Sequence, residues 1–188
     1  MKQFFDKEQM NETQIQLYEA LTFFTKLLAA GLIFQAILYI YPDTTPAQEF
    51  LAAIIAPIMD QIMKASFTAS GINVVTDGVR YIITQDCLGW KSMAAYTALI
   101  FAATKKYRKN LKYILGGIIL IYIANIVRII TTIYLSQAGI ISFEIIHDTL
   151  WKWSLTGIVF ILWIIWFEKL QYIDEPLSKV KAYIEKKF

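Results

Sequence analysis

The chain has 188 residues, is 57% hydrophobic, and carries a net charge of +3 with one cysteine and one histidine. Globular domains average about 45–50% apolar residues. Here the excess falls in long runs, which indicates a protein of the lipid bilayer. One cysteine excludes an intramolecular disulfide, and with one histidine it falls short of a four-ligand zinc site, so we expect neither a metal nor a cofactor. The positions of the lysines and arginines fit a membrane topology better than a nucleic-acid-binding surface.

Four apolar segments approach the roughly 20 residues that a helix needs to cross the hydrocarbon core. They are Ala20–Tyr41, Gly89–Tyr107, Tyr113–Leu135 and Trp151–Phe167. The predicted fold class is therefore an all-α polytopic membrane protein with about four transmembrane helices. We expect a single integral membrane domain over residues 1–188, in which residues 1–19 are a cytoplasmic leader.

Basic residues predict which connections face the cytoplasm. The segment "KKYRKNLK" (Lys105–Lys112) and the tail at 168–188 are rich in lysine, whereas Ser136–Thr149 contains neither lysine nor arginine. The positive-inside rule places the first two in the cytoplasm and the third outside a cell membrane. Because Cys87 precedes a span that ends in the basic segment, Cys87 is also expected outside.

Residues 42–88 are expected to form an external region between the first two spans. Its first part, "EFLAAIIAPIMDQIM" (Glu49–Met63), is interrupted by proline and polar residues, and we interpret it as an amphipathic helix on the outer surface. The alternative, that it spans the membrane, would place the N-terminus outside. In Gly71–Thr84, β-branched runs flank Asp77-Gly78, the type I′ turn signal of a short β-hairpin that leads directly to Cys87.

Arg128 is the least expected residue of the third span. It lies about seven residues before the outer end, or about 10 Å deep. An arginine there costs a few kcal/mol and normally faces a polar cavity or a partner. Alternatively, it snorkels outward or pairs with a structural carboxylate. Asn125 shares its helix face.

The sole cysteine, the sole histidine and this arginine are expected at one depth below the outer surface. Separately, Cys87 could be a small buried hydrophobe, His147 a surface residue and Asp148 a helix cap. Together they form a chemically complete set. A thiol becomes a good nucleophile when a base or a cation favours its thiolate. Histidine can act as that base and then as the acid for a leaving amine, and arginine can stabilise an oxyanion.

The stretches "DCLGW", "NIVRI" and "HDTLW" follow one another in this order. With them the chain resembles the exosortase/archaeosortase family of membrane cysteine transpeptidases over roughly residues 71–166. That family carries a Cys-x-Gly motif, an Asn-x-x-Arg motif and a later histidine, often followed by an acidic residue. Here the corresponding residues are Cys87 and Gly89, Asn125 and Arg128, and His147 and Asp148. Leu88 departs from the family, whose members usually have a small residue between Cys and Gly. We expect this difference to alter the wall of the pocket.

The resemblance implies a protease or transpeptidase that acts on surface proteins ending in a short motif, a transmembrane helix and a basic tail. Cys87 would attack the peptide carbonyl, Arg128 would hold the oxyanion, and His147 would protonate the departing amine. The resulting thioester would pass to an amine acceptor, plausibly a lipid, or to water. Gly89 would permit close backbone approach, and Asn125 would support Arg128 or the substrate.

Two other functions are compatible with the same residues. In a non-enzymatic membrane scaffold or transporter subunit, Arg128 would bind an anionic lipid headgroup or substrate. In a thiol redox protein, Cys87 would be the reactive group, but the chain has no second cysteine to resolve a mixed disulfide.

Overall fold

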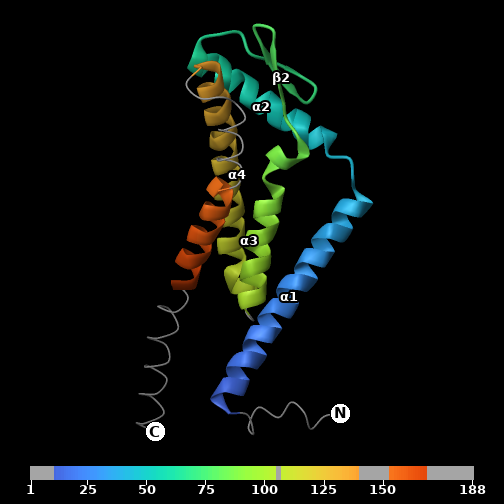
Figure 1. Cartoon of the computed structure of the whole chain (residues 1–188), viewed down its shortest axis with the longest axis vertical. Helices are drawn as coiled ribbons and strands as arrows, with labels where there is room; N and C mark the ends of the chain where they lie inside the picture. The colour runs from blue at the N-terminus through green and yellow to red at the C-terminus, as the bar shows by residue number, and fades with distance from the viewer. Residues whose placement is uncertain (1–10, 105–106, 140–152, 169–188) are drawn as a thin grey trace.

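The computed structural model of the chain describes residues 11–104, 107–139 and 153–168. These residues are mostly helical. In chain order the elements are α1 (Glu12–Ile40), α2 (Thr45–Met63), β1 (Thr68–Ser70), β2 (Asn73–Thr76), β3 (Val79–Ile82), the 3-10 helix η3 (Gln85–Leu88), α3 (Trp90–Ala103), α4 (Tyr107–Gln137) and the helix Trp153–Glu168. Figure 1 shows α2 and the strands gathered at one end of the longer helices, which we call the sheet end.

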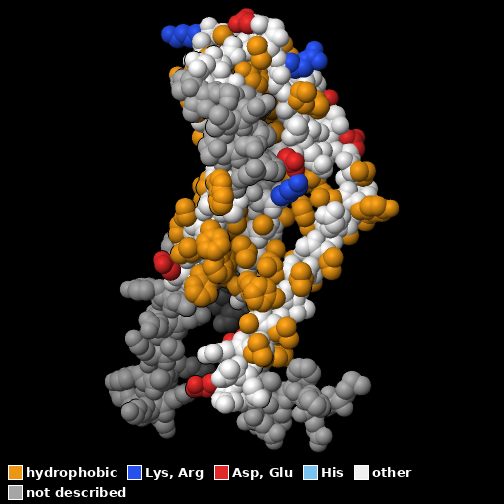
Figure 2. All heavy atoms as spheres, in the orientation of Figure 1, with side chains coloured by type: hydrophobic (Ala, Val, Ile, Leu, Met, Phe, Trp, Pro, Cys, Tyr) orange, Lys and Arg blue, Asp and Glu red, His pale blue; other side chains and the backbone are white. Residues whose placement is uncertain are grey.

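Helix α1 is apolar yet has no buried residue. It begins earlier than the predicted span because Asn11 caps it: the Asn11 side chain accepts a hydrogen bond from the N–H of Glu12 at 2.7 Å. Its contact with α3 includes an edge-on pair of the Phe34 and Trp90 rings, with centroids 5.7 Å apart. Hydrophobic side chains cover α1 and the helices below the sheet end (Figure 2), and such a surface suits lipid better than water.

Two helices in the described part of the chain are long and apolar enough to cross a membrane, Glu12–Ile40 and Asn110–Gln137. They cover the first predicted span up to Ile40 and the whole of the third. Within the described residues, the other two predicted spans also contain helices, and these helices are shorter. Helix α3 has 14 residues, or about 21 Å of helix, against a hydrocarbon core of about 30 Å. The described part of the last helix, Trp153–Glu168, is apolar but shorter than a full span.

Helices α3, α4 and Trp153–Glu168 share one hydrophobic core, which includes Tyr96, Ile100, Ile121 and Val159. Helices α3 and α4 approach each other closely at Gly117, where an added Cβ would lie 2.1 Å from the Tyr96 ring. Only glycine therefore lets α3 and α4 pack at this distance. The Tyr96 hydroxyl is also satisfied there, because it donates a 3.1 Å hydrogen bond to the carbonyl oxygen of Tyr113.

The sheet end has a second core, between the strands, α2 and the last part of α4. The predicted hairpin is confirmed: β2 and β3 pair antiparallel around Asp77 and Gly78, whose φ angles of 39° and 80° are those of a type I′ turn. The sequence did not predict β1, which pairs with β2 and gives the order β1-β2-β3.

The predicted amphipathic helix is confirmed as α2, although it begins at Thr45 rather than Glu49. Its buried stripe recurs at helical spacing and consists of Gln48, Leu51, Ala52, Ile55, Ala56 and Met59. This stripe packs on the sheet and on α4 rather than being free to face lipid. The amide of Gln48 fixes the strand end to α2, because its Nε2 donates a 2.7 Å hydrogen bond to the carbonyl oxygen of Ile83.

Candidate active site

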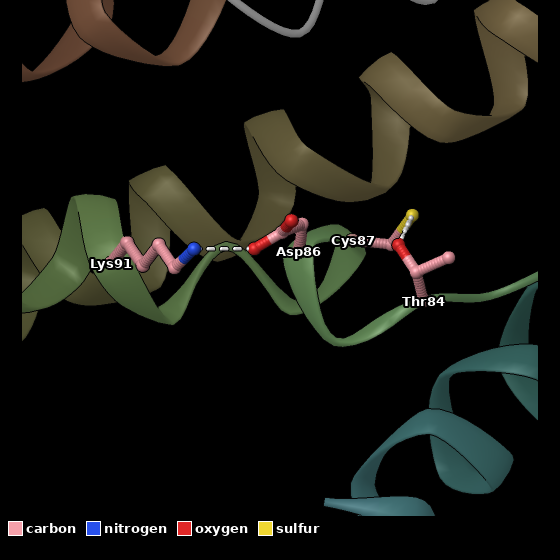
Figure 3. A network of polar contacts seen from close by, with 4 residues as sticks. All are labelled: Thr84, Asp86, Cys87 and Lys91. Carbon is pink, nitrogen blue, oxygen red and sulfur yellow. Dashed lines mark hydrogen bonds and ion pairs between the residues drawn. The ribbon is translucent and has the colours of Figure 1, made fainter. Parts of the chain in front are cut away.

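Cys87 lies in η3, the short turn of helix that joins β3 to α3. Its N–H donates a 2.9 Å hydrogen bond to the carbonyl oxygen of Thr84, and its Sγ lies 3.3 Å from the Thr84 hydroxyl. Figure 3 shows this hydroxyl beside the sulfur, whereas Asp86 turns toward Lys91 and forms an ion pair with it at 2.5 Å. The thiol is half-buried and packs against the core of the sheet end.

The loop that carries Cys87 is held against α4 by Asn125. The Asn125 side chain is fully buried, and its Nδ2 donates a 2.7 Å hydrogen bond to the carbonyl oxygen of Cys87. Gly89 makes room for this contact, since a Cβ at that position would lie 2.9 Å from the Asn125 Cγ. Gly89 also has a φ of 73°, a backbone conformation that disfavours other residues. These two motif residues therefore fit directly against each other.

Arg128 follows Asn125 on the same face of α4 and is 8% exposed. This burial excludes an arginine whose side chain is mostly in water. Within the described residues the one ion pair is that of Lys91 with Asp86, so none of the described carboxylates forms a salt bridge with Arg128. Arg128 instead lines the same cavity as Cys87.

Cys87 and Arg128 line one cavity of about 560 Å³. One wall is β3 and the residues after it, and the other wall is α4. The lining residues are Val79, Arg80, Tyr81, Ile82, Ile83, Thr84, Cys87, Arg128, Ile129, Thr132, Ile133 and Ser136. The sequence placed the hairpin next to Cys87 but did not predict that β3, Thr84, Thr132 and Ser136 share the cavity. The only sequence feature that indicated this wall was that the predicted hairpin leads directly to Cys87.

The site residues predicted from sequence are thus brought together in part. Cys87, Gly89, Asn125 and Arg128 meet at the junction of η3 and α4. The remaining two, His147 and Asp148, lie outside the described residues. Among the described residues no group of three His, Cys, Asp or Glu side chains is placed to hold a metal ion.

This arrangement combines a thiol, a hydroxyl at hydrogen-bond distance from it, and a buried guanidinium at the same cavity. A neighbouring cation favours a thiolate. Hydrogen-bond donors and cations in a water-poor pocket also stabilise negative charge that develops on a substrate oxygen. The cavity walls supply mostly apolar groups and so keep the dielectric low, which strengthens both effects. The geometry is therefore suited to attack by Cys87 on a carbonyl group.

The chain is mostly helical and has apolar surfaces, and its cysteine shares a cavity with a buried arginine. These features place it among the helical membrane proteins with a candidate thiol site. The transmembrane exosortase family (Exosortase_EpsH) matches residues 13–167, and the chain belongs to this family. Exosortases are in general membrane cysteine peptidases or transpeptidases. No curated protein and no solved structure matched the chain. The family match contains every motif residue named above.

Proposed function

We propose that the protein is a membrane-embedded cysteine transpeptidase that cleaves C-terminal sorting signals from surface proteins. The observation that carries the proposal is the cavity shared by Cys87 and Arg128, two residues from motifs far apart in the sequence. A lone cysteine or a lone buried arginine has ordinary explanations. A thiol and a guanidinium on one cavity, in a chain of the exosortase family, favour covalent acyl transfer.

The reaction has two steps. His147 takes the proton of the Cys87 thiol, and the sulfur attacks the scissile carbonyl. A carbon–sulfur bond forms, and the peptide carbon–nitrogen bond breaks as His147 gives that proton to the departing amine. An amine acceptor then attacks the thioester carbonyl, and an amide forms while the carbon–sulfur bond breaks. His147 takes the proton that this amine loses and passes it to the departing Cys87 sulfur, so the thiol is restored. With water as the acceptor, the same steps amount to hydrolysis.

The other residues have supporting roles in this scheme. Arg128 stabilises the oxyanion of both tetrahedral intermediates, and Asp148 orients His147. Asn125 holds the Cys87 loop through its hydrogen bond to the Cys87 carbonyl oxygen. Gly89 permits that contact.

The proposed topology places the sheet end outside the cell. Helices α1, α3, α4 and Trp153–Glu168 cross or enter the membrane, the basic segment Lys105–Lys112 lies in the cytoplasm, and residues 42–88 lie outside. Cys87 and Arg128 are then near the outer surface of the bilayer. A cleavage motif that directly precedes a substrate's own transmembrane helix reaches the enzyme at this level.

The substrates are surface proteins that end in a short motif, a transmembrane helix and a basic tail. The acceptor that we propose is the amine of a lipid. A lipid acceptor would leave the processed protein anchored at the cell surface after its own helix is removed. A protein with such a three-part ending, encoded by the same genome, can serve as the reporter for a test.

The test uses one such surface protein as the reporter in host cells. Cys87→Ala should abolish processing while the variant accumulates to the level of the unaltered protein. Processing that persists in Cys87→Ala would instead favour the scaffold or transporter function, in which Arg128 binds an anion.

Mass spectrometry of trapped enzyme provides the second arm. We expect an acyl adduct on Cys87 that disappears in Arg128→Ala. Lys91→Ala is the matched control, because Lys91 is a cation close to Cys87 in sequence that does not line the cavity and is 58% exposed. An adduct that forms equally well in Arg128→Ala and Lys91→Ala would refute the oxyanion role.

A further inference from the structure

β3 is an edge strand, and its pairing with β2 determines which of its backbone groups are free. The N–H of Ile83 donates to the carbonyl oxygen of Ile72 at 2.9 Å. In an antiparallel pair, alternate residues have the same orientation, so Tyr81 also directs its N–H and C=O groups toward β2. The N–H and C=O groups of Arg80 and Ile82 therefore point away from the sheet.

These outward groups border the cavity that contains Cys87. The whole stretch 79–84 lines that cavity, and no described residue forms a backbone hydrogen bond with the free edge of Arg80 or Ile82. The Ile82 side chain is itself 57% exposed. Unpaired N–H and C=O groups on an edge strand are a template for another extended chain.

The cavity is lined by consecutive residues of β3 on one side and by α4 on the other. β3 and α4 run along it in opposite directions: the Tyr81 hydroxyl donates to Gln137 at 2.9 Å near the end of α4, whereas Cys87 is bonded to Asn125, about three turns earlier. At about 3.3 Å per residue, residues 79–84 give a wall of about 17 Å, enough for about five extended residues. Cys87 lies at the far end of this wall.

We propose that the substrate residues preceding the scissile bond bind as a fourth strand, parallel to β3, and deliver the scissile carbonyl to Cys87. This inference rests on the proposed transpeptidase function. The direction follows from topology. A substrate that enters from the sheet end and continues into the membrane as a helix runs the same way as β3.

Strand addition determines what the enzyme can recognise. Backbone hydrogen bonds to Arg80 and Ile82 hold any extended peptide, so they contribute affinity without sequence preference. The side chains on the inner face of the added strand lie over α4, against Ile129 and Ile133 and the hydroxyl of Thr132. We therefore expect selectivity at alternate positions of the motif, for residues of apolar or small hydroxyl character.

The test measures alkylation of Cys87, the chain's one thiol, in purified full-length protein. The probe is acetyl-tetraalanyl chloromethyl ketone, which alkylates the sulfur with loss of chloride, and iodoacetamide serves as the small reagent. Ile82→Pro removes the outward N–H and leaves the β2 ladder intact, because proline is tolerated where an edge N–H faces outward. Ala69→Pro is the matched control, since Ala69 has the outward position on β1 and does not line the cavity.

The ratio of the peptide-probe rate to the iodoacetamide rate should fall about fivefold to tenfold in Ile82→Pro, the loss expected for one backbone hydrogen bond. It should stay unchanged in Ala69→Pro. Equal ratios in the two variants would overturn the strand-addition proposal.

A second measurement uses the unaltered protein and so does not depend on a folded proline variant. A series of probes, each N-methylated at one alanine amide, should show slow alkylation at alternate positions, where the amide faces β3. A series without alternation overturns strand addition. If processing in cells still requires Cys87, the transpeptidase function stands while this inference alone fails.

Discussion

The side-chain amide of Asn125 donates a 2.7 Å hydrogen bond to the carbonyl oxygen of Cys87 across 38 residues of sequence. This contact joins the Cys-x-Gly motif to the Asn-x-x-Arg motif. It positions the cysteine loop on the helix that carries Arg128. Asn125 is therefore a positioning residue rather than one that contacts the reacting atoms.

Asn125→Asp should impair the proposed activity by removing the donor from this contact. A carboxylate accepts hydrogen bonds only, so it would face the Cys87 carbonyl oxygen without a proton to share. A buried polar group left unpaired costs about 1–3 kcal/mol. We expect slower alkylation of Cys87 by iodoacetamide and reduced reporter processing. Unchanged values for both would show that the contact does not position the loop.

Gly89→Ala should destabilise the same junction for two reasons. The added Cβ would lie 2.9 Å from Asn125 Cγ, and the φ of 73° disfavours alanine. We expect a loss of about 1–3 kcal/mol in stability, measured as earlier thermal unfolding in detergent. Gly89→Ala combined with Asn125→Ala should lose less than the sum of the two single variants, because the clash is then relieved. Simple additivity would argue against the contact.

Gly117→Ala should disrupt the packing of α3 on α4, because its Cβ would overlap the Tyr96 ring at 2.1 Å. Overpacking of this kind typically costs about 1–3 kcal/mol. The adjacent Gly116→Ala is the matched control, as a Cβ there meets nothing within 4 Å. Thermal unfolding in detergent should separate the two variants, with only Gly117→Ala less stable. The same melting temperature for both would contradict the described helix packing.

Thr84→Val tests the hydroxyl that lies 3.3 Å from the Cys87 sulfur. Valine keeps the branched shape and removes the hydrogen bond, which is worth about 0.5–1.5 kcal/mol. Iodoacetamide should then alkylate Cys87 about twofold to tenfold more slowly, if the hydroxyl donates to the thiolate. Thr84→Ser keeps the hydroxyl and should restore most of the rate. A rate in Thr84→Val equal to that of Thr84→Ser would remove Thr84 from the mechanism.

The helices and the hairpin follow from local features of the sequence. Apolar runs long enough for a bilayer predicted α1 and α4, and Asp77-Gly78 between β-branched runs predicted the β2–β3 turn. Turn chemistry and hydropathy act over a few residues, so they can be read without knowing the rest of the fold. The strand β1, with three exposed residues, gave no such signal.

The family motifs selected Cys87, Asn125 and Arg128 as candidates, and a long segment of the chain matches the exosortase family. A common depth was predicted for Cys87, Arg128 and His147: helical rise gave the depth of Arg128, and the ends of the spans placed the other two. The roles of Cys87, Arg128, His147 and Asp148 stay predictions, and the last two lie outside the described residues.

Tertiary structure alone decided how the cavity is built. A strand and a helix about 50 residues apart enclose it, and no periodicity in either segment encodes that distance. The same holds for Gly89, because Asn125 occupies the space that a side chain at this position would need. It also holds for the apolar stripe of α2, which packs against the protein core of the sheet end. Hydropathy shows how strongly a residue avoids water. Which residues it contacts in the fold depends on which surfaces fit together. The sequence therefore determined which segments avoid water, and packing determined that the edge of β3 opens beside Cys87.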